Sequence, residues 1–131
     1  MSDGSFASPI VFLSFGFKYG IPECDTLIDC RVLPNPYWVV ELRYFTGLDK
    51  EIISWLNDKE EAVEYLEQTE RFLRDYLTKS LQKGNRNHLV VAFGCTGGQH
   101  RSAYVASTLA KRLGEEFDIE VHHRELEGGK R

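Results

Sequence analysis

The sequence has no run of about 18 apolar residues, which is the length that a membrane-spanning helix needs. Its first residues also lack the basic stretch followed by an apolar stretch that is typical of a secretory signal peptide. The P-loop motif GxxxxGK[ST] of many ATPases and GTPases occurs nowhere in the chain. We therefore expect a cytoplasmic protein that neither contacts a membrane nor hydrolyses nucleotides through a P-loop.

Cysteine is scarce, and its spacing is not that of a metal site. The three cysteines, Cys24, Cys30 and Cys95, form no C-x-x-C pair of the kind that binds zinc. The adjacent His122 and His123 would point to opposite faces of a strand, which is poor geometry for a shared ion. We therefore expect reduced thiols, no metal ion and no other cofactor.

Positive charge is also in short supply. The chain has 16 Lys and Arg against 20 Asp and Glu, a net charge of −4. This balance argues against a surface covered with nucleic-acid-binding charge. Basic residues nevertheless outnumber acidic ones from Lys83 onward, and all 4 histidines lie in that region. An anion-binding site is therefore expected in the last third of the chain.

Hydrophobic residues make up 42% of the 131 residues, enough for one domain with its own core. Apolar runs rich in β-branched and aromatic residues predict strands, and apolar residues at three- and four-residue steps predict helices. The strands are expected at 9–15, 26–33, 88–93 and 118–126, and the helices at 51–56, 59–82 and 103–113. Asp58 is the expected N-cap of the longest helix. The alternation predicts an α/β layered sandwich in which helices flank a mixed, partly parallel sheet of about four strands.

The stretch GCTGGQHRS, residues 94–102, joins a predicted strand to a predicted helix. The first N–H groups of a helix have no partner within it, and glycines let a backbone approach an anion closely. Thr96 and Ser102 add hydroxyl donors, and Arg101 can bind phosphate oxygens bidentately. In α/β proteins, ligands usually bind at the carboxyl ends of the strands. The stretch is therefore predicted to bind a phosphate group.

The same stretch also matches the C-x5-R signature of the cysteine phosphatases. Cys95 would be the nucleophile, activated by the helix and by Arg101. However, Gly94 stands where the tyrosine phosphatases have histidine, and no WPD-like stretch supplies an obvious general acid. The candidates for such an acid are Asp29, Asp49 and His100. A cysteine-dependent phosphatase is therefore the alternative to a phosphate site without catalytic residues.

Residues outside this stretch are weaker candidates for ligand contacts. Lys18 lies on a glycine-flanked loop and either contacts the ligand or is simply exposed to solvent. Asp29 and Arg31 lie two apart on a predicted strand, so they face the same side and either hold a ligand or pair with each other. Several aromatic residues are expected mostly in the core rather than in a stacking platform: Phe12, Phe15, Phe17, Tyr37 and Trp38.

Five stretches together resemble one known family. They are SFGFKYGIP (14–22), IDCRVLPNPYW (28–38), ELRYFTGLD (41–49), GCTGGQHRS (94–102) and HHREL (122–126). In this order and spacing, they resemble the C-terminal domain of the RapZ (YvcJ-like) family of RNase adapter and nucleotide-binding proteins. The resemblance runs from about Phe12 to Glu125, and five separate motifs make it far more specific than the C-x5-R match.

The resemblance implies a regulatory α/β domain, related in shape to a phosphofructokinase subdomain, that binds an amino-sugar phosphate such as glucosamine-6-phosphate. It assigns the phosphate to Thr96, Gly97, Gly98, Gln99, His100, Arg101 and Ser102. The candidates for the sugar side are Lys18, Asp29, Arg31 and Asn35. The implied partners are this phosphorylated metabolite, a small regulatory RNA in the control of hexosamine synthesis, and either a second copy of the chain or a kinase-like domain. Full-length members have an N-terminal P-loop kinase-like domain that this chain lacks, so residues 1–131 are expected to form a single RapZ C-terminal-like domain.

Overall fold

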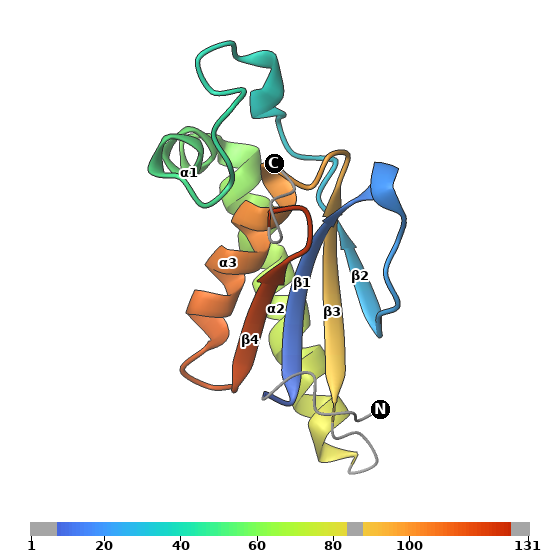
Figure 1. The fold of residues 1–131 in the computed structure, drawn as a ribbon. Coiled ribbons are helices and arrows are strands. Elements are labelled where there is room, and N and C mark those ends of the chain that lie inside the picture. The colour runs from blue at the N-terminus through green and yellow to red at the C-terminus, as the bar shows by residue number, and fades with distance from the viewer. Residues whose placement is uncertain (1–7, 84–87, 127–131) are drawn as a thin grey trace.

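The computed structural model describes residues 8–83 and 88–126. Its strands and helices combine in one α/β fold (Figure 1). In chain order they are β1 (Ile10–Gly16), β2 (Thr26–Asp29), α1 (Lys50–Asn57), α2 (Glu60–Gln82), β3 (Leu89–Cys95), α3 (Arg101–Leu113) and β4 (Ile119–His123). Two short 3₁₀ turns, η1 (Phe17–Tyr19) and η2 (Pro36–Trp38), follow β1 and β2.

The four strands form one sheet in the order β2-β3-β1-β4, and every neighbouring pair is parallel. The prediction of an α/β layered fold is therefore confirmed, whereas the antiparallel component implied by a mixed sheet is absent from the described strands. Each connection carries the chain back along the sheet before the next strand begins, and residues 17–25 do so without an α-helix. All four strands consequently place their carboxyl ends at the same edge of the sheet, which is the usual ligand-binding edge.

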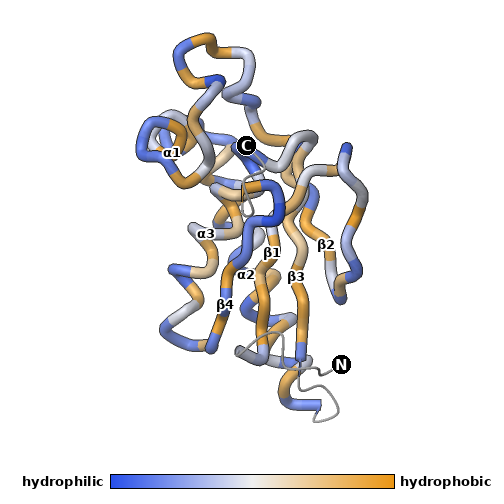
Figure 2. The backbone as a smooth tube through the Cα atoms, viewed as in Figure 1, coloured by the Kyte–Doolittle hydropathy of each residue, from blue (hydrophilic) through white to orange (hydrophobic). Residues whose placement is uncertain are grey.

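The core lies between the sheet and the two longer helices. In Figure 1, α2 and α3 lie on the same side of the sheet. The central strands β1 and β3 are hydrophobic along most of their length (Figure 2), as expected of interior parallel strands. Phe12 of β1 and Phe93 of β3 pack with ring centroids 5.0 Å apart. The buried residues of α2 recur at three- and four-residue steps, and they are Ala62, Leu66, Thr69, Leu73 and Leu77.

Several element boundaries differ from the predicted ones. The second strand ends at Asp29 rather than Leu33, because the chain turns there and the N–H of Leu33 donates to the carbonyl of Cys30. The N-cap of α2 is Lys59, while Asp58 caps the C-terminus of α1 and donates its N–H to Ser54. Helix α3 begins at Arg101, two residues earlier than predicted, and its C-cap is Gly114. None of the helices within the described ranges is long and apolar enough to cross a membrane.

Candidate phosphate-binding site

A cavity of about 420 Å³ opens at the carboxyl ends of β1 and β3. Three segments that are distant in sequence contribute its lining. They are η1, the chain around η2, and the loop between β3 and α3. The lining residues are Lys18, Tyr19, Asn35, Tyr37, Trp38, Cys95, Thr96, Gly97, Gln99, His100 and Arg101. The structure thus brings most of the predicted contact residues to one cavity.

Four of the predicted contact residues do not line this cavity. Gly98 packs against Gly16 at the end of β1, and Ser102, in the first turn of α3, donates its N–H to the Cys95 sulfur. Asp29 and Arg31 pair with each other through two hydrogen bonds, Nε to Oδ1 at 2.9 Å and Nη2 to Oδ2 at 2.8 Å. These hydrogen bonds lower the pKa of Asp29, and the Arg31 guanidinium also lies 3.8 Å from the ring centroid of Phe17. The internal salt bridge is therefore present, and a sugar contact by this pair remains a prediction.

Two glycines let the loop after β3 pack against the end of β1. Gly98 has φ of 76°, in the left-handed region that favours glycine. A Cβ at Gly98 would lie 2.6 Å from the backbone nitrogen of Gly16, and a Cβ at Gly16 would lie 2.5 Å from the carbonyl carbon of Gly97. By contrast, a Cβ on Gly97 would meet no heavy atom within 4 Å. Gly98 and Gly16 therefore set the position of the loop, whereas Gly97 presents open backbone to the cavity.

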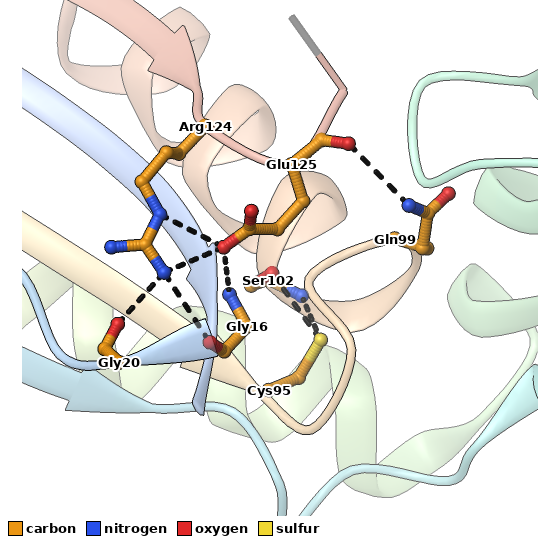
Figure 3. A network of polar contacts seen from close by, with 7 residues as sticks. All are labelled: Gly16, Gly20, Cys95, Gln99, Ser102, Arg124 and Glu125. Carbon is orange, nitrogen blue, oxygen red and sulfur yellow. Dashed lines mark hydrogen bonds and ion pairs between the residues drawn. The ribbon is translucent and has the colours of Figure 1, made fainter. Parts of the chain in front are cut away.

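A carboxylate at the end of β4 braces this arrangement (Figure 3). Glu125 is only 3% exposed, and its Oε2 accepts hydrogen bonds from the backbone N–H of Gly16 at 2.9 Å and from Arg124 Nη2 at 2.7 Å. Arg124 Nη2 also donates to the carbonyl of Gly20, and Gln99 Nε2 donates to the carbonyl of Glu125. Glu125 and Arg124 thus tie together the loops that follow β1 and β3. Sequence reasoning assigned them no role, although the HHREL motif contains both.

Arg101, the first residue of α3, is a buried cation in the cavity wall. It is 6% exposed, and its Nη1 donates to the carbonyls of Arg31 at 2.9 Å and Leu33 at 3.1 Å. Its Nε is buried and has no hydrogen-bond partner among the described residues. Leaving a buried donor unsatisfied costs about 1–3 kcal/mol, and more when the group is charged. The cavity residue Arg101 therefore carries a buried, unsatisfied donor.

His100 connects the loop to the segment before α1. The side chain is 6% exposed, and its Nε2 lies 3.1 Å from the carbonyl of Arg43. Burial lowers the pKa of His100, and hydrogen bonds to the backbone of Phe45 and Arg43 oppose that shift. The N–H of Gly47 donates to the carbonyl of Gln99 at 2.8 Å, which adds a second link. His100 is therefore held as a neutral imidazole, whose hydrogen bond fixes the position of the loop.

Cys95 has part of the geometry of a cysteine-phosphatase nucleophile. Its Sγ accepts a hydrogen bond from the N–H of Ser102 at 3.3 Å and lies 3.2 Å from the Ser102 hydroxyl. None of the residues that line the described cavity is an aspartate or a glutamate. Of the candidate acids, Asp29 is paired with Arg31, and Asp49 accepts the N–H of Thr46. Cys95 is therefore a hydrogen-bonded thiol at the end of β3, and no aspartate or glutamate lines the described cavity beside it.

The aromatic residues divide into two groups. Phe12 and Phe15 are fully buried and Phe17 is partly buried, as expected of core residues. Tyr37 and Trp38 are 46% and 73% exposed and line the cavity, so the prediction that they belong to the core was wrong. The chain around η2 extends past the carboxyl ends of the strands (Figure 1), which lifts these two side chains off the sheet. Local sequence carries no signal for that displacement, because aromatic residues beside prolines also occur in buried turns.

Within the described ranges, no group of three or more His, Cys, Asp or Glu side chains is placed to hold a metal ion. All three cysteines are free thiols. Burial raises the pKa of the Cys30 thiol well above its usual range, which keeps that side chain protonated at neutral pH. The cavity lining combines cations and aromatic rings with amide, hydroxyl and thiol side chains.

A parallel α/β sheet with a cavity and a glycine-rich loop at its strand ends defines a ligand-binding domain of the α/β class. The family model for the RapZ C-terminal domain matches residues 8–127, and the chain belongs to that family. It is similar to a nucleotide-binding protein of Actinobacillus pleuropneumoniae, with 46% identity over 92% of this chain and 43% of the relative. It is also similar to one of Idiomarina loihiensis, with 44% identity over 89% of this chain and 42% of the relative. The chain thus spans less than half the length of these curated relatives.

Proposed function

We propose that this domain binds a phosphorylated metabolite in the cavity and acts as a regulatory sensor, with an amino-sugar phosphate such as glucosamine-6-phosphate as its ligand. The observation that carries the proposal is Arg101, a cation that is 6% exposed, lines the cavity and has an Nε without a hydrogen-bond partner among the described residues. Nearly buried cations are rare unless something compensates them. The two carbonyls bonded to Nη1 compensate Arg101 in part, and a dianionic phosphate would complete the compensation.

The surroundings of Arg101 also favour an anion. Lys18 lines the same cavity, and no acidic residue does so in the described part of the chain. Arg101 begins the 13-residue helix α3, whose N-terminus carries partial positive charge and has no side-chain cap. Gly97 adds open backbone at the cavity. Two cations, a helix N-terminus and a glycine-rich loop all support a phosphate ligand.

The regulatory role rests on the family rather than on the cavity. We propose that ligand binding here controls an RNA-adapter activity in hexosamine synthesis. The net charge of −4 makes strong RNA binding by this domain alone unexpected, because affinity for the phosphate backbone grows with the number of phosphates neutralised by basic residues. A gel-shift series with structured RNA at rising salt tests this role. The adapter proposal fails for this domain if no complex forms even at low salt.

Calorimetric titration with glucosamine-6-phosphate tests the ligand. We expect measurable binding by the wild type and its loss in Arg101→Ala. Arg112→Ala is the matched control, since Arg112 lies on the same helix but pairs with Glu70 and is not a cavity residue. Thermal melting of each variant checks that it is folded at the titration temperature. Equal, negligible heats for the wild type and both variants would refute the proposed ligand.

A second candidate function is a cysteine-dependent phosphatase. The observation that favours it is the hydrogen bond from the backbone N–H of Ser102 to the Cys95 sulfur, because hydrogen bonds to sulfur stabilise a thiolate. This function predicts turnover of p-nitrophenyl phosphate that disappears in Cys95→Ser. Ser107→Ala, at a partly buried position of α3 that does not line the cavity, is the control that should retain turnover. Activity no higher than the blank in the wild type removes this candidate.

A further inference from the structure

The side chains of Tyr37 and Trp38 together form an aromatic lip on the cavity. Their rings are arranged edge to face, with centroids 5.3 Å apart at 84°. The Arg43 guanidinium lies 4.8 Å from the Tyr37 ring centroid. Trp38 is 73% exposed, so most of the indole surface faces solvent beside the predicted phosphate contacts.

The backbone beneath the lip is fixed by hydrogen bonds. Asn35 Oδ1 accepts the N–H of Tyr37 at 3.1 Å, and the carbonyl of Asn35 accepts the N–H of Trp38 at 3.2 Å. Arg43 Nε donates to the carbonyl of Tyr37 at 3.0 Å. The two rings are therefore presented on an ordered turn. Ordering before binding lowers the entropy cost of binding a ligand.

Exposing an indole in this way sacrifices the stabilisation that burial of a large apolar side chain would give. Single exposed apolar residues are common, but Trp38 is grouped with Tyr37 and Tyr19 around one cavity. Binding pockets typically combine aromatic walls with a few polar groups that fix orientation. The lip is therefore placed as the apolar wall of the site whose polar part is the loop from Thr96 to Arg101.

Resting on the proposed function, we infer that the aromatic lip selects the organic part of the ligand, so that the site takes a phosphomonoester carrying a ring whose face packs against Trp38. A pyranose and a nucleobase share this chemistry, because both present a flat or apolar face. Inorganic phosphate has no such face and is a weaker ligand.

The test compares three probes, namely inorganic phosphate, glucosamine-6-phosphate and adenosine 5′-monophosphate, by calorimetric titration of the whole 131-residue chain. Trp38→Ala should weaken binding of the preferred ring-bearing probe by about tenfold while changing phosphate affinity less than about twofold. Trp38→Phe should restore most of the loss. Tyr44→Ala is the matched control, because Tyr44 is 89% exposed in the same part of the chain but does not line the cavity. Which ring-bearing probe loses affinity in Trp38→Ala identifies the ring that the lip holds.

Three results overturn the inference while the proposed function stands, and a fourth result overturns both. If Trp38→Ala weakens phosphate and the ring-bearing probes equally, Trp38 acts on the fold of the site rather than on ligand choice. If it weakens neither, or if the wild type binds phosphate as tightly as both ring-bearing probes, the lip selects nothing and only the phosphate site stands. If the wild type binds none of the three probes, the proposed function fails and the lip fails with it.

Discussion

Of two adjacent glycines in the loop after β3, only Gly98 should lose stability when a methyl group is added. In Gly98→Ala, the new Cβ would lie 2.5 Å from Glu125 Cγ, 2.6 Å from the nitrogen of Gly16 and 2.9 Å from the carbonyl carbon of Phe15. Two of these three atoms are backbone atoms, so they cannot move away by a side-chain rotation. The residue would also keep φ near 76°, which is unfavourable for alanine.

These costs give the expected size of the effect. A left-handed backbone costs about 1–2 kcal/mol for a residue with a Cβ, and overpacking costs about 1–3 kcal/mol. Alanine also lowers the conformational entropy of the unfolded chain, and this effect offsets about 0.4–1 kcal/mol of the cost. Gly98→Ala should therefore lower the free energy of unfolding by about 3 kcal/mol, which is about 10 °C in Tm for a chain of this size.

Gly97→Ala is the matched control. A Cβ there meets no heavy atom within 4 Å, and Gly97 is not among the glycines with positive φ. We expect its free energy of unfolding, measured by urea denaturation, to stay within about 0.5 kcal/mol of the wild type. Its methyl group would instead intrude on the cavity and weaken binding of glucosamine-6-phosphate. Equal stability of the two variants would refute the assigned loop geometry.

The remaining predictions concern the brace, the buried histidine and the strand-to-helix contact. Glu125→Gln should lower the free energy of unfolding by about 2 kcal/mol, since it weakens charge-assisted hydrogen bonds to Gly16 and Arg124; a change below about 0.5 kcal/mol would show that the brace is not needed. Because burial lowers the pKa of His100 below its ordinary value of 6.5, the unfolded chain binds more protons there, so stability should fall as the pH drops below about 6.5. His100→Gln should flatten that slope in urea unfolding at a series of pH values, and an unchanged slope would contradict the neutral imidazole. Burial raises the pKa of Tyr65 to about 12, so its hydroxyl keeps its proton and donates to the carbonyl of Asp29. Tyr65→Phe should cost about 1 kcal/mol by urea denaturation, and a more stable variant would argue against that hydrogen bond.

Local sequence predicts a strand or helix well where its hydrophobic pattern is unambiguous. Strands β1 and β3 are continuous apolar runs, and α2 has an apolar stripe over several turns, so their positions follow from hydrophobic burial alone. The direction of β4 and the end of β2 depend on pairing and on turns. Asp58 shows a related limit, since a residue that suits an N-cap serves here as the C-cap of the preceding helix.

The candidate site divides in a similar way. The loop from Thr96 to Arg101 could be predicted because glycines, hydroxyls and a cation before a helix have a direct physical meaning at an anion site. The brace by Glu125 and the lip at Trp38 could not be predicted, because each depends on contacts between segments distant in sequence. Their spacing on one face left two alternatives open for Asp29 and Arg31, a contact with the ligand or a pair with each other. The hydrogen bonds between the two side chains show that they pair with each other.

The central claim is that the Nε–H of Arg101 donates to a bound phosphate. The most direct measurement is an ¹⁵N–¹H correlation spectrum of the arginine Nε–H groups during titration with glucosamine-6-phosphate, with the Arg101 signal assigned by its absence in Arg101→Lys. We expect a saturable shift of the Arg101 signal. The Nε–H signal of Arg74 should not shift, because this group pairs with Glu116 away from the cavity. An Arg101 signal that does not move while calorimetry records binding would contradict the account.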